Sequence, residues 1–110
     1  MKITKNFSLK EMTFSDTAMR RNIPNEPGIQ EVINLTALCC NILQPVRDHY
    51  GKSVRINSGY RSVKLCEAVG SSGRSQHAKG QAADFEINGL SNKELATWIY
   101  KNLDFDQIIL

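Results

Sequence analysis

The longest regular pattern of apolar residues lies between residues 29 and 43. Mostly apolar positions recur there at spacings of three and four: Ile29, Val32, Ile33, Thr36, Cys40 and Leu43. This spacing is typical of an amphipathic helix with one buried face. Pro45 lacks an amide hydrogen and clashes with the preceding turn, so it predicts a kink or a division of the helix. The helix is then expected to continue to Gly51, a plausible stop.

Two further helices are predicted from serine residues that precede them. Ser8 has Glu11 three positions on, and Ser91 has Glu94 in the same relation. Both pairs fit the capping box, in which the serine hydroxyl and the glutamate carboxylate satisfy free amides of the first turn. The second of these helices is expected to run to about Asn102.

Apolar and polar residues alternate in two short segments, 53–58 and 82–87, which predicts strands. A third strand is predicted at 105–110 from its β-forming residues. Between the first two strands lie a short helix at 62–69, capped by a serine, and a flexible loop at 70–76. The order of elements predicts an α+β fold, with helices packed on a small antiparallel sheet.

Length and composition limit the classes of protein that the chain can represent. With 110 residues and 41% hydrophobic content, the chain suffices for one domain with its own core, spanning residues 1–110. The net charge of +3 is small and the basic residues are scattered, which argues against a nucleic-acid partner. No run approaches the roughly 20 apolar residues of a membrane span, and the N-terminus has no signal-peptide core. We expect a monomer.

Three cysteines are present, and an odd count with two of them adjacent does not favour a disulfide framework. Cys39 and Cys40 fall in the apolar helix, where free cysteine behaves as a small hydrophobic residue. A metal or redox role is the alternative.

The candidate chemistry centres on His77 and Asp84, which lie seven positions apart with Gly80 between them. Both side chains are good zinc ligands. Alternation along the strand places Asp84 and Glu86 on the face opposite Phe85. A histidine–aspartate hydrogen bond is the alternative for the pair.

Arg61 lies upstream of this pair and carries a fixed positive charge. Taken alone, an arginine in this position more often forms a surface ion pair than a functional site.

Taken together, these segments resemble the zinc D-Ala-D-Ala peptidase family, and in particular its phage endolysin and bacterial cell-wall carboxypeptidase domains. The segments that carry the resemblance are Ser58-Gly59-Tyr60-Arg61-Ser62, Ala68-Val69-Gly70, Ser75-Gln76-His77, Gly80 and Ala82-Ala83-Asp84-Phe85. Further similar segments are Lys5-Asn6-Phe7-Ser8-Leu9-Lys10-Glu11-Met12, Leu43-Gln44-Pro45-Val46-Arg47 and Phe105-Asp106-Gln107-Ile108-Ile109-Leu110. The fold that this resemblance implies is the Hedgehog/DD-peptidase fold.

The resemblance implies a role for each matching residue. His77 corresponds to the first zinc ligand and Asp84 to the second. Arg61 corresponds to the arginine that binds the substrate carbonyl or carboxylate and stabilises the developing oxyanion. Ser75 and Gln76 correspond to motif positions that position substrate or contact the ligands. Tyr60, beside Arg61 in the motif, is expected to contact substrate as well.

The chain departs from the family pattern in two respects. Cys66 stands where the family often has asparagine, which places a thiol near the expected site. The family also follows its last strand with a glutamate general base and a histidine, commonly in Trp-x-His, as the third zinc ligand. Neither occurs before Leu110, so we expect a domain that lacks its C-terminal end. Within the chain, His49 is the alternative ligand and Glu86 the alternative base.

The function implied is a zinc-dependent metallopeptidase that hydrolyses bonds involving D-amino acids in peptidoglycan, either as a D-Ala-D-Ala carboxypeptidase or as an endolysin-type endopeptidase. Its partners would be peptidoglycan stem peptides. Synthesis in the cytoplasm is expected, with action at the cell wall after release. The alternative is a non-catalytic module on the same fold that binds peptidoglycan or a protein, because the third ligand and the base are missing.

Overall fold

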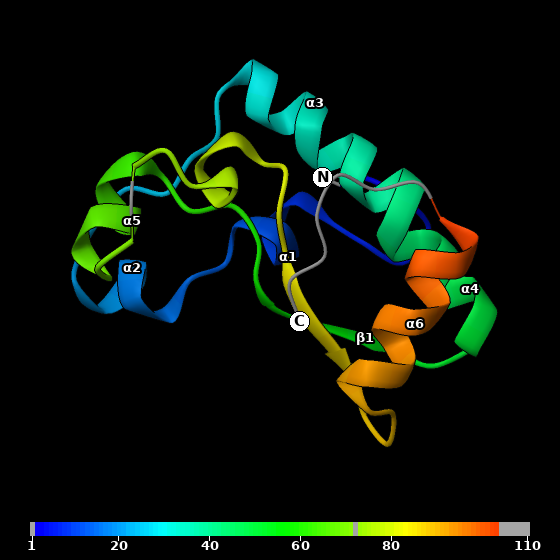
Figure 1. Cartoon of the computed structure of the whole chain (residues 1–110). Helices are drawn as coiled ribbons and strands as arrows, with labels where there is room; N and C mark the ends of the chain where they lie inside the picture. The colour runs from blue at the N-terminus through cyan, green and yellow to red at the C-terminus, as the bar shows by residue number, and fades with distance from the viewer. Residues whose placement is uncertain (1, 72, 104–110) are drawn as a thin grey trace.

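The computed structural model describes residues 2–71 and 73–103 (Figure 1). Its elements, in chain order, are α1 (Leu9–Thr13), α2 (Asp16–Arg20), α3 (Ile29–Leu38), the π-helical turn η1 (Cys39–Leu43), α4 (Gln44–Tyr50), β1 (Val54–Ser58), α5 (Val63–Ala68), the 3-10 turn η2 (Gln76–Lys79), β2 (Asp84–Ile87) and α6 (Asn92–Asn102). The two strands form one antiparallel sheet. The predicted α+β class is thus confirmed, while the strand predicted at 105–110 lies outside the described residues.

The serine caps act as predicted. The hydroxyls of Ser8, Ser62 and Ser91 each accept a hydrogen bond from the amide three residues on, at 3.1–3.2 Å. Ser15 caps α2 in the same way. This helix was not predicted from the sequence, because five residues are too few to show a helical period.

The long helix does not break at Pro45. Instead, the backbone passes through η1, where the amide of Gln44 donates to the carbonyl of Cys39, five residues back. A proline ring clashes with the carbonyl four residues before it, and a wider turn relieves that crowding. The path from Ile29 to Tyr50 therefore stays helical, with a π turn in place of the predicted division.

The register of the sheet contains one irregularity, at the end nearest the candidate site. Val54 pairs with Ile87, but the pairing shifts between Ile56 and Ser58, so that Ser58 lies opposite Asp84. The extra residue, Asn57, forms a bulge, and bulges change the face on which the following side chain lies. As a result, Ser58 shares a face of the sheet with Asp84.

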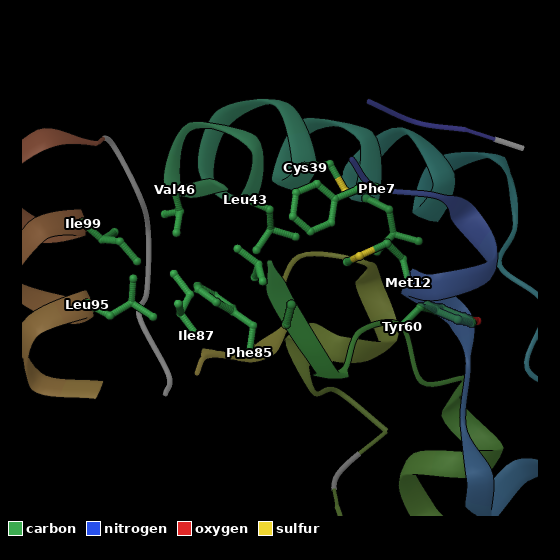
Figure 2. Close-up of a cluster of buried hydrophobic side chains, with 13 residues drawn as sticks. Phe7, Met12, Cys39, Leu43, Val46, Tyr60, Phe85, Ile87, Leu95 and Ile99 are labelled. Carbon is green, nitrogen blue, oxygen red and sulfur yellow. The ribbon is translucent and has the colours of Figure 1, made fainter. Parts of the chain in front are cut away.

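The core lies between the long helix and the sheet. Figure 2 shows Leu43 and Val46 from the helix meeting Phe85 and Ile87 from β2, with Leu95 and Ile99 of α6 closing one end. The other end of the core is closed by residues of the N-terminal arm and the start of the long helix: Phe7, Met12, Leu35 and Cys39. In Figure 1, α6 lies at one end of the molecule and α2 and α5 lie at the other.

The structure separates the two adjacent cysteines. Cys39 is fully buried, and burial raises the pKa of its thiol to about 12, so it acts as the predicted hydrophobic residue. Cys40 is exposed, and the prediction that it packs in the apolar interior is wrong. In the described part of the chain, no helix is long and apolar enough to cross a membrane.

Candidate metal centre

His77 lies in η2 and is 5% exposed, which makes it the one polar residue among those described that is buried. Its Nδ1 lies 2.7 Å from the carbonyl oxygen of Gly59. A carbonyl oxygen only accepts hydrogen bonds, so Nδ1 carries a proton, and in the neutral imidazole the lone pair is on Nε2. Metal-binding histidines are oriented in this way by a hydrogen bond from the other ring nitrogen.

The lone pair of His77 faces a carboxylate. Nε2 lies 3.6 Å from Oδ2 of Asp84, whose side chain is 36% exposed. This separation is too long for a direct hydrogen bond. Neutral Nε2 and the carboxylate oxygen are both acceptors, and a metal ion between them would satisfy both. With zinc bonds of about 2.0–2.1 Å at a tetrahedral angle, two ligand atoms lie about 3.3 Å apart, so the pair fits a shared zinc ion.

Two glycines let the backbone segments around the pair approach other elements closely. A Cβ on Gly59 would lie 2.3 Å from the carbonyl oxygen of Met12. Gly80 has a φ of +74°, and a Cβ there would lie 2.5 Å from the carbonyl oxygen of Glu31 in α3. Any other residue would clash at both positions, and at Gly80 it would also be strained. The absence of a side chain at these two glycines thus allows the end of β1 to pack against α1 and η2 to pack against α3.

Ser75 and Gln76 help to hold the turn that carries His77. The hydroxyl of Ser75 accepts from the amide of His77 at 3.1 Å, and the carbonyl of Gln76 accepts from the amide of Gln81 at 3.0 Å. Asn34 of α3 adds a hydrogen bond to the carbonyl of Lys79 at 2.7 Å. Ser75 and Gln76 thus contact the backbone of the turn that carries His77, and their expected contacts with substrate stay a prediction.

Arg61 is tied to the same turn. Its amide donates to the carbonyl of His77 at 3.1 Å. Its Nε is buried and has no hydrogen-bond partner among the described residues. A buried donor without a partner costs free energy, and such a group at a functional site is a candidate for contact with a ligand. The backbone of Arg61 is thus joined to the turn that carries His77.

Asn25 completes this arrangement, although no pattern in the sequence marks it as a functional residue. Its Nδ2 donates to the carbonyls of Thr13 and Tyr60 at 2.8 and 3.1 Å, and its Oδ1 accepts from the amide of Ser62 at 2.7 Å. The partners lie 12 to 37 residues away along the chain, so no local signal reveals them. Asn25 thereby fixes the loop that carries Arg61.

Cys66 lies beneath the same loop. It is fully buried, and its thiol donates to the carbonyl of Arg61 at 3.5 Å. An asparagine side chain, which the family often has here, can donate to a carbonyl in the same way. At the position where the chain departs from the family pattern, Cys66 thus contacts the backbone of Arg61.

The structure places Tyr60 in the hydrophobic core, where 6% of its surface is exposed (Figure 2). Burial raises the pKa of its phenol, with smaller contributions from Glu31 and Cys66. Its amide donates to the carbonyl of Met12 at 2.7 Å. The side chain thus anchors the backbone that leads into Arg61.

The two alternative site residues have other contacts. His49 stacks on Trp98 with ring centroids 4.3 Å apart, at the end of α4. Glu86 lies 3.9 Å from Arg55 across the sheet, and both side chains are largely exposed. Within residues 2–71 and 73–103, no group of three or more histidine, cysteine, aspartate or glutamate side chains converges to hold a metal ion. The described site therefore supplies two ligands.

Comparison with known proteins bears on the same residues. The family model for Peptidase M15 matches residues 5–109, which include His77, Asp84 and Arg61. No curated protein and no solved structure matches the chain. The family match covers almost the whole chain and confirms the resemblance to the zinc D-Ala-D-Ala peptidases. The chain therefore belongs to the Peptidase M15 family.

Proposed function

We propose that this protein is a zinc-dependent metallopeptidase that hydrolyses peptide bonds involving D-amino acids in peptidoglycan stem peptides. The observation that carries the proposal is the His77–Asp84 pair, whose 3.6 Å separation and fixed imidazole tautomer suit a shared metal ion. Membership of a peptidase family supports the same interpretation. The protein would act at the cell wall.

In this proposal, His77 and Asp84 hold the zinc ion. A bound zinc supplies a Lewis acid and lowers the pKa of a coordinated water. Arg61 binds the carbonyl or carboxylate oxygen of the substrate and stabilises the negative charge that develops there. Its buried Nε is suited to this role, because a guanidinium stays charged and acts more strongly where water is excluded. Ser75 and Gln76 position the His77 turn and contact the substrate at its edge.

A second candidate function is a non-catalytic module that binds stem peptides on the same surface. Catalytic zinc sites use three protein ligands and a water, and the described residues supply two. Glu86, the alternative general base, already faces Arg55. Zinc affinity is therefore the quantity that distinguishes the two functions.

The test measures zinc content, zinc affinity and the release of amino acids or peptides from purified peptidoglycan. We compare the wild type with His77→Ala and Asp84→Asn, and use His49→Ala as the control because it removes the other histidine of the chain. The enzyme proposal expects zinc binding and hydrolysis in the wild type and His49→Ala, and the loss of both in the site variants.

Three outcomes separate the candidates. Hydrolysis that survives His77→Ala overturns the site assignment. Binding of stem peptides without zinc uptake or cleavage supports the module instead. A wild type that neither takes up zinc nor binds stem peptides contradicts both candidates.

A further inference from the structure

An open pocket, here called the aromatic pocket, lies between the end of α4 and one face of α6. It has a volume of about 670 Å³. Ligand pockets in proteins have volumes of about 300–1,000 Å³, so the space suits a small organic ligand. The lining includes three rings and three charged side chains: His49, Tyr50, Trp98, Lys93, Glu94 and Lys101.

The aromatic pocket and the candidate metal centre lie at opposite ends of the sheet. α4 leads into Val54 at the start of β1, α6 follows Ile87 at the end of β2, and these two strand residues are paired. Asp84 is paired with Ser58 at the other end of the sheet. Figure 1 shows α4 and α6 side by side at one end of the molecule. The pocket is therefore a feature that the proposed function does not use.

The three rings of the pocket pack on one another. His49 of α4 stacks on Trp98 of α6 with ring centroids 4.3 Å apart, and Tyr50 meets Trp98 edge-on at 5.8 Å. These contacts fix the indole between the two helices. Tyr50 and Trp98 are only partly buried, so both rings keep some surface toward the pocket. Fixed aromatic rings with an open surface supply apolar contact area at a low cost in conformational entropy.

Hydrogen-bond donors surround these rings. Within the part of the chain that the structure describes, no residue accepts a hydrogen bond from Nε1 of Trp98, and no carboxylate pairs with Lys93 or Lys101. Burial and the nearby charge of Glu94 raise the pKa of the Tyr50 phenol, so its hydroxyl keeps its proton and can donate. Two lysines and one glutamate give the lining an excess of positive charge. A complementary ligand is rich in oxygen acceptors and is neutral or negative.

Rings that are combined with a rim of donors match one class of ligand in particular. A sugar ring has an apolar face of C–H groups and an edge of hydroxyl and carbonyl oxygens. A linear phosphodiester polymer offers negative charge but no face that packs on rings. Peptidoglycan, the polymer of the proposed substrate, contains strands of amino sugars, and its muramic acid units carry the carboxyl group to which stem peptides are attached.

We propose that the aromatic pocket binds an amino-sugar unit of the glycan strand, with its ring on Tyr50 and Trp98 and its carboxyl group toward Lys93 and Lys101. This inference goes beyond the proposed function and rests on it only for the source of the sugar. The pocket takes no part in bond cleavage. It raises the affinity for the polymer, so its loss lowers that affinity and leaves zinc uptake and hydrolysis in place.

The experiment measures sugar binding to the metal-free protein by NMR. Trp98 is the one tryptophan of the chain, so the indole N–H signal reports on this pocket alone. The probes are the disaccharide N-acetylglucosaminyl-N-acetylmuramic acid, with a free carboxylate, and di-N-acetylchitobiose, which has none. Poly(glycerol phosphate) tests for a phosphodiester ligand. Neither disaccharide contains a peptide bond, and His77→Ala is expected to bind both as the wild type does, so a failure of the peptidase proposal leaves this measurement intact.

The wild type is expected to bind the acidic disaccharide about 3- to 10-fold more tightly than chitobiose, the effect of one added polar contact. Replacing both lysines, Lys93→Gln with Lys101→Gln, is expected to remove this preference and to leave chitobiose binding unchanged. Tyr50→Ala is expected to weaken the binding of both disaccharides about 3- to 10-fold. Lys64→Gln is the matched control, because Lys64 is an exposed lysine of α5, at the other end of the molecule.

Two results overturn the proposal at the level of the ligand: neither disaccharide shifts the indole signal, or poly(glycerol phosphate) binds more tightly than both. A preference for the acidic disaccharide in the double lysine variant that equals the preference in Lys64→Gln also overturns it. The lysine variants replace exposed side chains, so the test stands even where Tyr50→Ala fails to fold.

Discussion

The side-chain amide of Asn25 hydrogen-bonds to both peptide groups that flank Arg61. It donates to the carbonyl of Tyr60 at 3.1 Å and accepts from the amide of Ser62 at 2.7 Å. The amide and carbonyl of Arg61 itself bond to His77 and Cys66. Hydrogen bonds thus fix the peptide groups on both sides of Arg61, as preorganised sites require.

Replacing Asn25 is expected to impair catalysis without removing the metal. Asn25→Ala leaves the Ser62 amide and two carbonyls without their partner, which costs about 1–3 kcal/mol in the free energy of unfolding. Misplacement of a catalytic group by about 1 Å lowers rates about 100-fold. We therefore expect a 10- to 100-fold fall in kcat/KM, mainly in kcat, at unchanged zinc affinity.

Two variants make this test specific. Asn25→Asp keeps the acceptor for Ser62 and loses the two donated hydrogen bonds, so its kcat should lie between those of Asn25→Ala and the wild type. Asn102→Ala removes an exposed asparagine whose side chain donates to the carbonyl of Trp98 in its own helix, and should leave kcat unchanged. A kcat in Asn25→Ala equal to that of Asn102→Ala would show that Asn25 does not position Arg61.

The elements that the sequence predicted correctly are those with local causes. Serine caps located the starts of α1, α5 and α6, and alternation located β1 and the outward face of Asp84 in β2. A helix cap is recognised from residues three positions apart, and a strand face from residues two positions apart. Short segments of sequence are therefore enough to predict both. The predicted strand at 82–87 was two residues too long at its start.

The features that the sequence did not reveal depend on distant contacts. The η2 turn is held by its own serine and by Asn34 from α3, and the Arg61 loop is held by Asn25. The motif marked His77, Asp84 and Arg61 as candidates, but the distances around them follow from packing. No spacing along the chain encodes contacts of this kind.

Gly80 is expected to be intolerant of any side chain for two separable reasons. Its φ of +74° disfavours L-residues, and a Cβ would lie 2.5 Å from the Glu31 carbonyl. Gly70 has a φ of +84°, but no atom of the described residues lies within 4 Å of the position that a Cβ would take there. Gly70→Ala should therefore cost only backbone strain, about 1–2 kcal/mol.

Gly80→Ala should cost more than Gly70→Ala, because η2 must also move away from α3. That movement displaces His77, so zinc affinity should fall in Gly80→Ala and stay at the wild-type level in Gly70→Ala. Urea unfolding and zinc titration measure the two effects. Equal destabilisation by the two substitutions would contradict the close contact with α3.

Glu86→Gln tests the alternative general base. The carboxylate lies 3.9 Å from Arg55 and both side chains are largely solvent-exposed. Exposed ion pairs contribute about 0–1 kcal/mol, so the free energy of unfolding should change little. Hydrolysis by Glu86→Gln should match the wild type, with Arg55→Gln as the partner control. A loss of kcat in Glu86→Gln alone would identify Glu86 as the base.

The thiols of Cys39 and Cys40 are expected to differ sharply in reactivity. Cys39 is fully buried, and burial, with smaller effects of Cys40 and Glu11, raises its pKa from 9.0 to about 12. Cys40 is exposed. Since the thiolate is the reactive form, a thiol reagent at pH 8 should modify Cys40 and leave Cys39 unmodified in the folded protein. Modification of Cys39 at the rate of Cys40 would contradict its burial.

The raised pKa of the Cys39 thiol also predicts that the protein loses stability at alkaline pH. The unfolded chain releases the Cys39 proton near pH 9 and the folded chain only near pH 12, so the stabilisation is complete below pH 9 and is lost as pH rises between these values. Urea unfolding between pH 7 and 10.5 should show that the free energy of unfolding declines less with pH in Cys39→Ala than in the wild type. The cavity that this substitution leaves lowers the stability equally at every pH. Buried Tyr60, whose pKa is also raised, leaves a residual slope. Cys40→Ala should keep most of the wild-type slope, because burial is the larger cause of the raised Cys39 pKa and Cys40 a smaller one. A slope in Cys39→Ala equal to that of Cys40→Ala would contradict the shift.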